Sequence, residues 1–212
     1  MKLNKVVLIS AIAIAGIGLS ACSSNSAKNG NSVKTTQTSK KKNNDQEKVI
    51  SQNKELRAKF DQIKVGDLMK KGQGGSTEKQ VEKLLGEPNS TDSSKTDGIK
   101  TSGATWNKEN VSITVAYTDH NAVSKLITGF KWNHRPEKLT LKEFKAIKDG
   151  SSYESVVKKY GDPDGLDESL IMGQKTISAT WFTGIKAKNA GSNVILTFTN
   201  NKLTNKTQTD LK

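Results

Sequence analysis

The apolar positions between residues 139 and 163 follow the spacing of two short amphipathic helices. Thr140 and Glu143 form the pattern of a capping box at the start of the first helix, which is predicted to stop at Gly150. The apolar stripe of this helix contains Phe144 and Ile147. The pattern therefore indicates one short helix with a single buried face.

The second helix of this segment is predicted to begin at Ser151, with Glu154 completing another capping box. Gly161 occupies the position of a C-terminal cap, and Pro163 cannot continue the helix. Its inward positions are Val156, Val157 and Tyr160. Two helices in succession thus precede whatever follows Pro163.

Elsewhere the apolar period changes from helical to two. The stretch "ITVAY" (113–117) alternates large apolar residues with Thr and Ala, and "VILTF" (194–198) behaves similarly. This alternation is typical of antiparallel strands with one face packed on a core and the other face open. Strands are therefore predicted after each pair of helices.

The whole order occurs twice in the chain. The segment "GSTEKQVEKLLGEP" (75–88) returns as "GSSYESVVKKYGDP" (150–163), and two "ATW" triplets (104–106 and 179–181) keep the same offset. Such self-similarity predicts a repeat architecture. We expect an α+β fold of two tandem repeats, each with two helices followed by a three- to four-stranded antiparallel sheet. The expected boundaries are 53–132 for repeat 1, 133–139 for a connector and 140–212 for repeat 2.

These motifs resemble the tandem-repeat β-lactamase-inhibitor-protein-like (BLIP-like) fold, and more closely a set of Gram-positive lipoproteins built on it. The similarity rests on the helices ending in "GEP" and "GDP", the "ATW" strands and the closing "TFTNNKLTNK", and it covers residues 53–212. It implies the fold and offers enzyme inhibition only by analogy. The secreted inhibitors carry disulfides, whereas this segment has no cysteine.

The N-terminus has the pattern of an export signal. Lys2 and Lys5 precede an apolar run of 14 residues (6–19), which is shorter than the roughly 20 residues that span a bilayer. Its end resembles a bacterial lipobox, formed by Leu19, Ser20, Ala21 and Cys22. The resemblance implies cleavage after residue 21, lipidation of Cys22 and anchoring at the extracytoplasmic face of the cell membrane. The alternative is an ordinary secretory signal followed by a stray cysteine.

Residues 22–52 are predicted to form a flexible tether. Residues 23–52 contain six lysines, two acidic residues and no aromatic residue, so they have little to bury on folding. The run "KKK" (40–42) is either part of a solvated linker or a site for anionic lipid or envelope polymer. The net charge of the full sequence is +13, but export argues against a nucleic-acid partner.

No motif in the chain favours catalysis. "KKGQGGST" (70–77) lacks the lysine that directly precedes the hydroxyl residue in a phosphate loop, and the two histidines, His120 and His134, have no metal-ligand spacing. "DPDGLDES" from Asp162 only approximates a calcium loop and is expected to be a solvated turn. We therefore expect no enzyme activity, no metal and no cofactor.

Binding is then the predicted role, with a protein as the expected partner. If the open strand faces carried the aromatic residues, the two repeats would form an aromatic floor. The alternative is that these rings pack in the core, and Trp132 is the residue expected to be most exposed. The candidate binding residues are Trp132, Trp106 and Trp181. The alternatives are binding of an anionic envelope polymer or lipid through the basic surface, and inhibition of a β-lactamase-type enzyme.

Overall fold

The computed structural model describes residues 53–96, 99–133 and 135–212. The predicted signal peptide, Cys22 and the predicted tether lie outside these residues, as does His134. The described chain begins with helical residues 53–61. The remaining elements are η1 (Leu68–Lys70), α2 (Glu78–Leu85), β1 (Ser90–Thr96), β2 (Ile99–Lys108), β3 (Val111–Thr118), β4 (Asn121–Thr128), α3 (Leu141–Ala146), α4 (Tyr153–Tyr160), β5 (Gly165–Ile171), β6 (Gln174–Trp181), β7 (Asn193–Thr199) and β8 (Lys202–Thr209).

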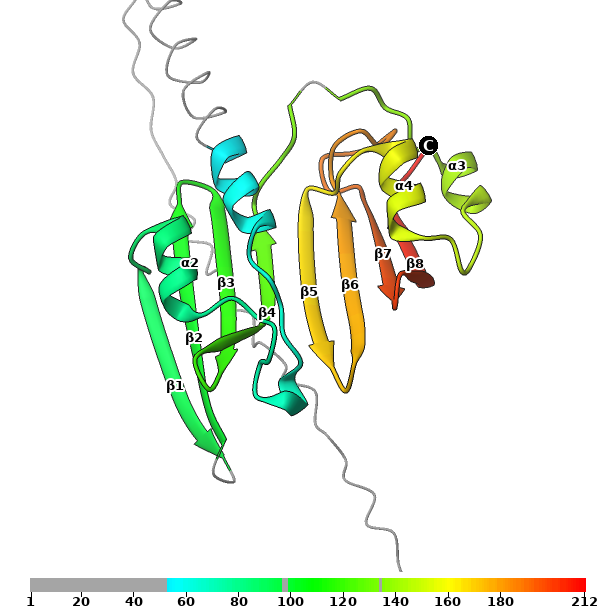
Figure 1. The fold of residues 1–212 in the computed structure, drawn as a ribbon. Coiled ribbons are helices and arrows are strands. Elements are labelled where there is room, and N and C mark those ends of the chain that lie inside the picture. The colour runs from blue at the N-terminus through cyan, green and yellow to red at the C-terminus, as the bar shows by residue number, and fades with distance from the viewer. Residues whose placement is uncertain (1–52, 97–98, 134) are drawn as a thin grey trace, which may run out of the picture. The chain divides into compact units, whose positions relative to one another are not determined.

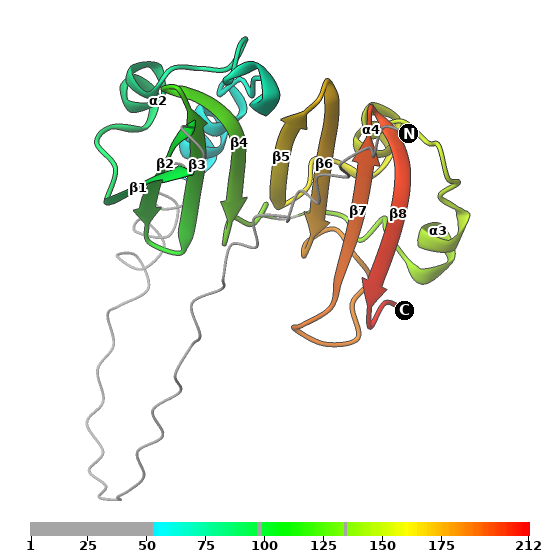
Figure 2. The ribbon, with the colours of Figure 1, turned by 90° about the horizontal axis from the view of Figure 1, so that it is seen from below.

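All the described strands belong to one antiparallel sheet of eight strands in sequential order, β1 to β8 (Figure 1). The hairpins β1–β4 and β5–β8 meet where β4 pairs with β5, over the register Ser124↔Ser169 to Ile127↔Leu166. The structure therefore has an α+β architecture, as expected, but with a single continuous sheet. Figure 2 shows the strands in this order from another side.

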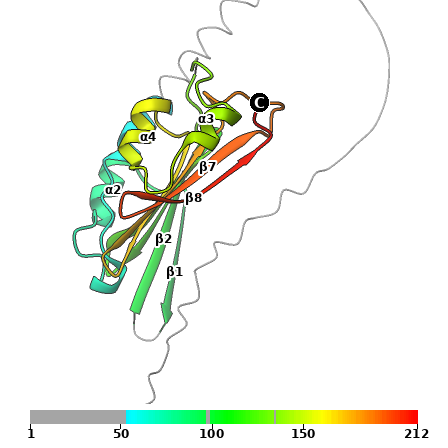
Figure 3. The same ribbon diagram turned by 90° about the vertical axis from the view of Figure 1, so that its right-hand side faces the viewer.

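The described helices lie on one face of the sheet, and no described element covers the other face (Figure 3). The core fills the space between sheet and helices. Its largest fully buried side chains are Trp106, Trp181, Tyr117, Phe60, Phe130 and Phe198. Since only 5% of the sequence is aromatic, most of its rings are used to build this layer.

The helix starts follow the sequence patterns, with two corrections. Thr77 caps α2 and forms a full capping box with Gln80. Ser152, not the predicted Ser151, caps α4, since the oxygen of its side chain accepts from Ser155 N. Thr140 caps α3, but the carboxylate of Glu143 pairs with α4 instead of closing the predicted box.

The helix ends follow from glycine and proline. Gly86 after α2 and Gly161 after α4 have φ angles of 87° and 85°, where a side chain would be strained. Helix α3 ends earlier than predicted, at Ala146 instead of near Gly150. Ile147 is nevertheless buried, with 6% of its surface exposed, because the chain after α3 still packs on the core.

The segment from Asp162 is not the solvated turn expected from its sequence. Asp164 is fully buried, and β5 starts at Gly165, so Asp167, Glu168 and Ser169 are strand residues. The polar composition of this stretch did not suggest a strand. Residues of β5 nevertheless alternate between the two sheet faces, and Glu168 lies on the helix side, opposite Lys125.

Several contacts recur at matching positions in the two halves of the chain. The indole of Trp106 donates to Gly86 O at 2.8 Å, and the indole of Trp181 donates to Gly161 O at 3.0 Å. Lys125 Nζ donates to Phe60 O and Ile63 O, as Lys206 Nζ donates to Phe144 O and Ile147 O. In each case the ammonium satisfies carbonyls that a helix end leaves free.

Candidate binding face of the sheet

Pairing registers divide the strand residues between the two faces. In β3, Ile113, Val115 and Tyr117 are at most 2% exposed and point toward the helices. Ser112, Thr114 and Ala116 alternate with them and point to the open face, where they are partly exposed. Extending this alternation through the registers assigns every strand residue with a regular partner.

The open face is built mainly from serine and threonine, and we call it the hydroxyl face. Direct contacts support the assignment, because Thr105 Oγ1 lies 3.3 Å from Thr114 Oγ1 and Ser94 Oγ lies 2.8 Å from Thr101 Oγ1. Its hydroxyl residues are Ser90, Ser94, Thr101, Thr105, Ser112, Thr114, Ser124, Thr128, Ser169, Thr176, Ser178, Thr180, Thr197, Thr199, Thr207 and Thr209.

Charge is distributed unequally between the faces. The register places Asp92 and Asp167 on the hydroxyl face, with Lys202 at its β7–β8 end. The other lysines of the described strands fall on the helix side; they are Lys95, Lys100, Lys108, Lys125, Lys175 and Lys206. A chain with a large excess of lysine thus keeps one broad surface nearly free of positive charge.

The rings of the described strands pack in the core, so the open face carries no aromatic floor. Tyr117 and Phe198 are 2% and 0% exposed and pack under the helices. Trp106 and Trp181 are 2% and 0% exposed, so neither can contact a partner in this structure. The helices cover the sheet face that carries the large side chains, because burying rings yields more free energy than burying serine and threonine. Burial also raises the pKa of the Tyr117 hydroxyl.

Trp132, the residue expected to be most exposed, is half-buried at the junction of β4 and β5. Its indole donates to Pro163 O at 3.0 Å, and its ring meets Phe130 edge-on with centroids 4.8 Å apart. The guanidinium of Arg57 lies 5.6 Å from the Trp132 ring centroid and donates to Pro163 O at 2.8 Å. Trp132 is therefore part of the contact between the two halves.

Asp164 organises the same junction, although nothing in the sequence around it indicated this role. Its carboxylate accepts from the backbone N–H groups of Trp132, Phe182 and Thr183 at 2.9, 2.7 and 2.8 Å, and from the Thr183 hydroxyl at 2.7 Å. Arg135 Nη1 lies 3.9 Å away. A fully buried carboxylate with four donors is a structural anchor, and no acceptor capacity faces a ligand.

The two ionisable groups that come closest to a catalytic arrangement, His120 and Glu78, also have structural roles. His120 lies in the β3–β4 turn, and its Nδ1 is 2.8 Å from Glu78 Oε2. Ser102 Oγ donates to Glu78 Oε1 at 2.7 Å. The carboxylate thus sits between the histidine and the serine, so the histidine cannot take the serine proton as a general base would. These contacts tie α2 to the sheet.

Within residues 53–96, 99–133 and 135–212, no group of three or more His, Cys, Asp or Glu side chains could hold a metal ion. A hollow in this part of the chain is lined by Asn53, Glu55, Leu56, Lys59, Lys108 and Glu109, and in it Lys59 Nζ lies 2.8 Å from Glu55 Oε1. None of the helices in the described part of the chain is both long and apolar enough to cross a membrane.

Comparison with protein families decides the relationship. A family model described as a Domain of Unknown Function with a solved structure (DUF3862) matches residues 52–211, about three quarters of the chain. The chain belongs to the DUF3862 family. No curated protein matches the sequence.

Comparison with a solved structure defines the fold of this DUF3862 chain more specifically. It is similar to a Streptococcus mutans protein described as a "putative beta-lactamase inhibitor protein", with 30% identity and a TM-score of 0.69. The match covers 76% of the present chain and 98% of the other. The fold of this DUF3862 member is therefore BLIP-like, as the sequence motifs implied.

Proposed function

We propose that this DUF3862 protein is an exported lipoprotein, anchored through Cys22, that binds another protein without catalysing a reaction. Two tandem BLIP-like repeats would form its binding domain, and the signal motif Leu19–Ser20–Ala21 would direct its processing. The hydroxyl face is the observation that carries the binding role.

The hydroxyl face suits a protein partner for two physical reasons. It is one surface that extends across both halves of the sheet and is covered by no described helix. Serine and threonine side chains such as Thr114 and Ser178 are short, so ordering them on binding costs little entropy, and each can donate and accept a hydrogen bond. This favours a polar, shape-matched interface.

The charge distribution disfavours an anionic polymer as the ligand of this face. Such a ligand requires lysine or arginine, whereas the charged groups that the register places on this face are Asp92, Asp167 and, at its β7–β8 end, Lys202. Polymer binding would have to use the helix side. Polymer binding remains the alternative, and its affinity would fall steeply with added salt, whereas the affinity of a protein interface on the hydroxyl face would not.

The two-repeat interpretation is supported by the recurring contacts. The indole bonds of Trp106 and Trp181 and the ammonium bonds of Lys125 and Lys206 occupy matching positions of the two segments. Asn89 and Asp164 also match, since each side chain accepts the backbone N–H of the residue that follows its ATW triplet.

Photo-crosslinking in cells tests the binding role. A crosslinking amino acid at Ser178, on the hydroxyl face, should give a protein adduct, and the same group at Lys79, exposed on α2, should not. Adducts from Lys79 alone would remove the hydroxyl face as the binding site. Thr114→Arg should abolish the Ser178 adduct without changing expression, because the long charged side chain holds a partner off.

The lipid anchor has its own test. Cys22→Ala should move the chain from the membrane fraction to the medium or the soluble fraction, and should abolish labelling by a radioactive fatty acid. Retention in the membrane by the Cys22→Ala chain would contradict the anchor.

Inhibition of a β-lactamase is a second candidate, favoured by the similarity to the Streptococcus mutans protein. Adding the purified chain at micromolar concentration to a β-lactamase with a chromogenic substrate tests it directly. An unchanged rate of hydrolysis would remove this candidate without affecting the proposal of another protein partner.

A further inference from the structure

Three exposed apolar side chains gather at the end of the sheet that holds η1 and the β5–β6 turn. Met69 is 56% exposed, Ile171 is 38% exposed and Met172 is 67% exposed. We call them the methionine tip. They come from segments about one hundred residues apart, so their meeting is a product of the fold.

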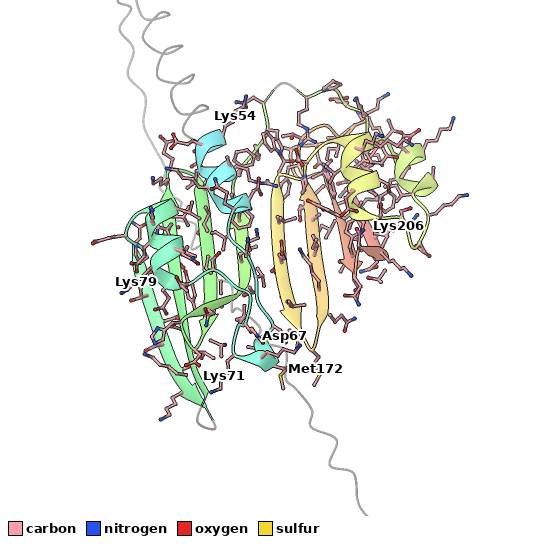
Figure 4. The ribbon with its side chains drawn as sticks, in the orientation of Figure 1. Lys54, Asp67, Lys71, Lys79, Met172 and Lys206 are labelled. Carbon is pink, nitrogen blue, oxygen red and sulfur yellow. The ribbon has the colours of Figure 1, made fainter. Side chains whose placement is uncertain are left out.

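A buried carboxylate holds the methionine tip together. Asp67 is 5% exposed; its Oδ1 accepts from Met69 N at 2.9 Å and from Met172 N at 3.1 Å, and its Oδ2 accepts from Gly173 N at 2.7 Å. Figure 4 shows Asp67 beside Met172 at this end of the sheet. The apolar side chains are thus mounted on a fixed backbone.

The surroundings of the tip are basic. Lys70 and Lys71 follow Met69 directly and are exposed, and Lys100 is exposed on β2, where its carbonyl accepts from Asp119 N. Lys71 Nζ is 4.0 Å from the exposed carboxylate of Asp119. An apolar point flanked by lysines matches an anionic bilayer, whose headgroups attract the ammonium groups while the apolar side chains enter the interface.

We propose that the methionine tip is a second membrane contact, which inserts into the interface of an anionic bilayer and orients the anchored domain. This inference rests on the proposed lipid anchor at Cys22. The contact would hold the domain with one end at the lipid and leave the hydroxyl face free along the sheet.

The length of the N-terminal segment permits this arrangement. Figure 4 places Lys54 and Met172 at opposite ends of the sheet, and the ten residues of β2 span about 33 Å. A polar tether of the thirty residues 23–52 would have an r.m.s. reach of about 30 Å. Reach and span agree, which is the condition for the highest effective concentration of the tip at the membrane.

Lipid quenching of a fluorophore tests the contact. The full lipidated chain, purified from membranes and reconstituted in vesicles, would carry a dye on Met172→Cys; Cys22 would be blocked by its lipid. The matched control is Lys79→Cys, exposed on α2 and separate from the tip in Figure 4. The vesicles would contain phosphatidylglycerol with phosphatidylcholine, or phosphatidylcholine alone, with bromine on the acyl chains as the quencher.

We expect quenching of the dye at position 172 in the anionic vesicles only, and none at position 79. Replacing Lys70 and Lys71 by glutamine should lower the inserted population about fivefold per lysine, whereas the same change at Lys142 and Lys145 on α3 should not. Equal quenching at positions 172 and 79, or none at position 172, would overturn the proposal. Flotation with the vesicles reports the Cys22 anchor separately, so failure of the anchor cannot be mistaken for failure of the tip.

Discussion

Replacing Asp164 by asparagine should destabilise the domain by about 3 kcal/mol. The carboxylate is fully buried and accepts four hydrogen bonds, with Trp132 N and Thr183 Oγ1 at Oδ1, and Phe182 N and Thr183 N at Oδ2. An asparagine side chain keeps one oxygen only. Its less damaging orientation retains the Oδ2 position and turns the NH₂ group toward Trp132 N.

The magnitude follows from these contacts. One buried N–H donor is left without an acceptor, which costs about 1–3 kcal/mol. The bonds from Phe182 and Thr183 lose the charge of their acceptor and become about half as strong, which adds about 1 kcal/mol. For a domain of this size the sum corresponds to a fall in melting temperature of about 6–12 °C, and it leaves a typical domain folded.

Urea unfolding followed by tryptophan fluorescence measures the effect. Asp162→Asn is the matched control, because its carboxylate is exposed and accepts no hydrogen bond from a described residue; its change should stay within about 0.5 kcal/mol. If the two variants unfold at the same urea concentration, Asp164 is not the anchor of the junction and the reasoning is wrong.

Further predictions concern the recurring contacts and acid stability. Trp106→Phe and Trp181→Phe should each cost about 1–3 kcal/mol by calorimetry, because each leaves a glycine carbonyl unsatisfied; a large difference between them would contradict equivalent roles. Lys206→Met should be destabilising, since Lys206 satisfies the carbonyls at the end of α3, and hydrogen exchange should show that helix opening first. Partial burial alone would raise the pKa of Glu78, but hydrogen bonds from His120 and from a serine outweigh it and lower the pKa. Because the pKa is lower in the folded state, the Glu78 carboxylate stabilises the fold above its ordinary pKa, and this contribution is lost as the pH falls through the folded-state pKa. The advantage of the wild type over Glu78→Gln in urea should therefore shrink below about pH 4.5. A difference that stays constant with pH would contradict this.

The starts and ends of helices, and the alternation of strands, could largely be predicted from the sequence. Thr77 and Thr140 begin helices, Gly86 and Gly161 end them, and the alternation of residues 113–117 is that of a strand. These features depend on neighbouring residues in the chain, and so they are encoded locally.

The candidate site was less readable because it depends on which strand face the helices cover. Alternation separates Thr105 from Trp106 but does not say which of them points inward. The scarcity of aromatic residues was a usable signal that the rings form the core. The runs of serine and threonine at alternate positions in β6 and β7 could have indicated the hydroxyl face. The sequence does not single out Asp164 over Asp162 as an anchor, because the donors to Asp164 come from Trp132, Phe182 and Thr183, which only the fold brings to it.

The pairing of β4 with β5 has a mechanical consequence for the domain. Its four register pairs are the only ladder that joins the two hairpin sets in the described sheet. Lys54 and the C-terminus lie toward the same end of this sheet, as Figures 1 and 4 show. Tension applied between Lys54 and the C-terminus would break the β4–β5 hydrogen bonds one after another from that end, instead of loading all of them at once. The Arg57 bond to Pro163 O would carry the first load and the Asp67 bonds to the β5–β6 turn the last, so the two ends of this seam set the force at which the halves separate.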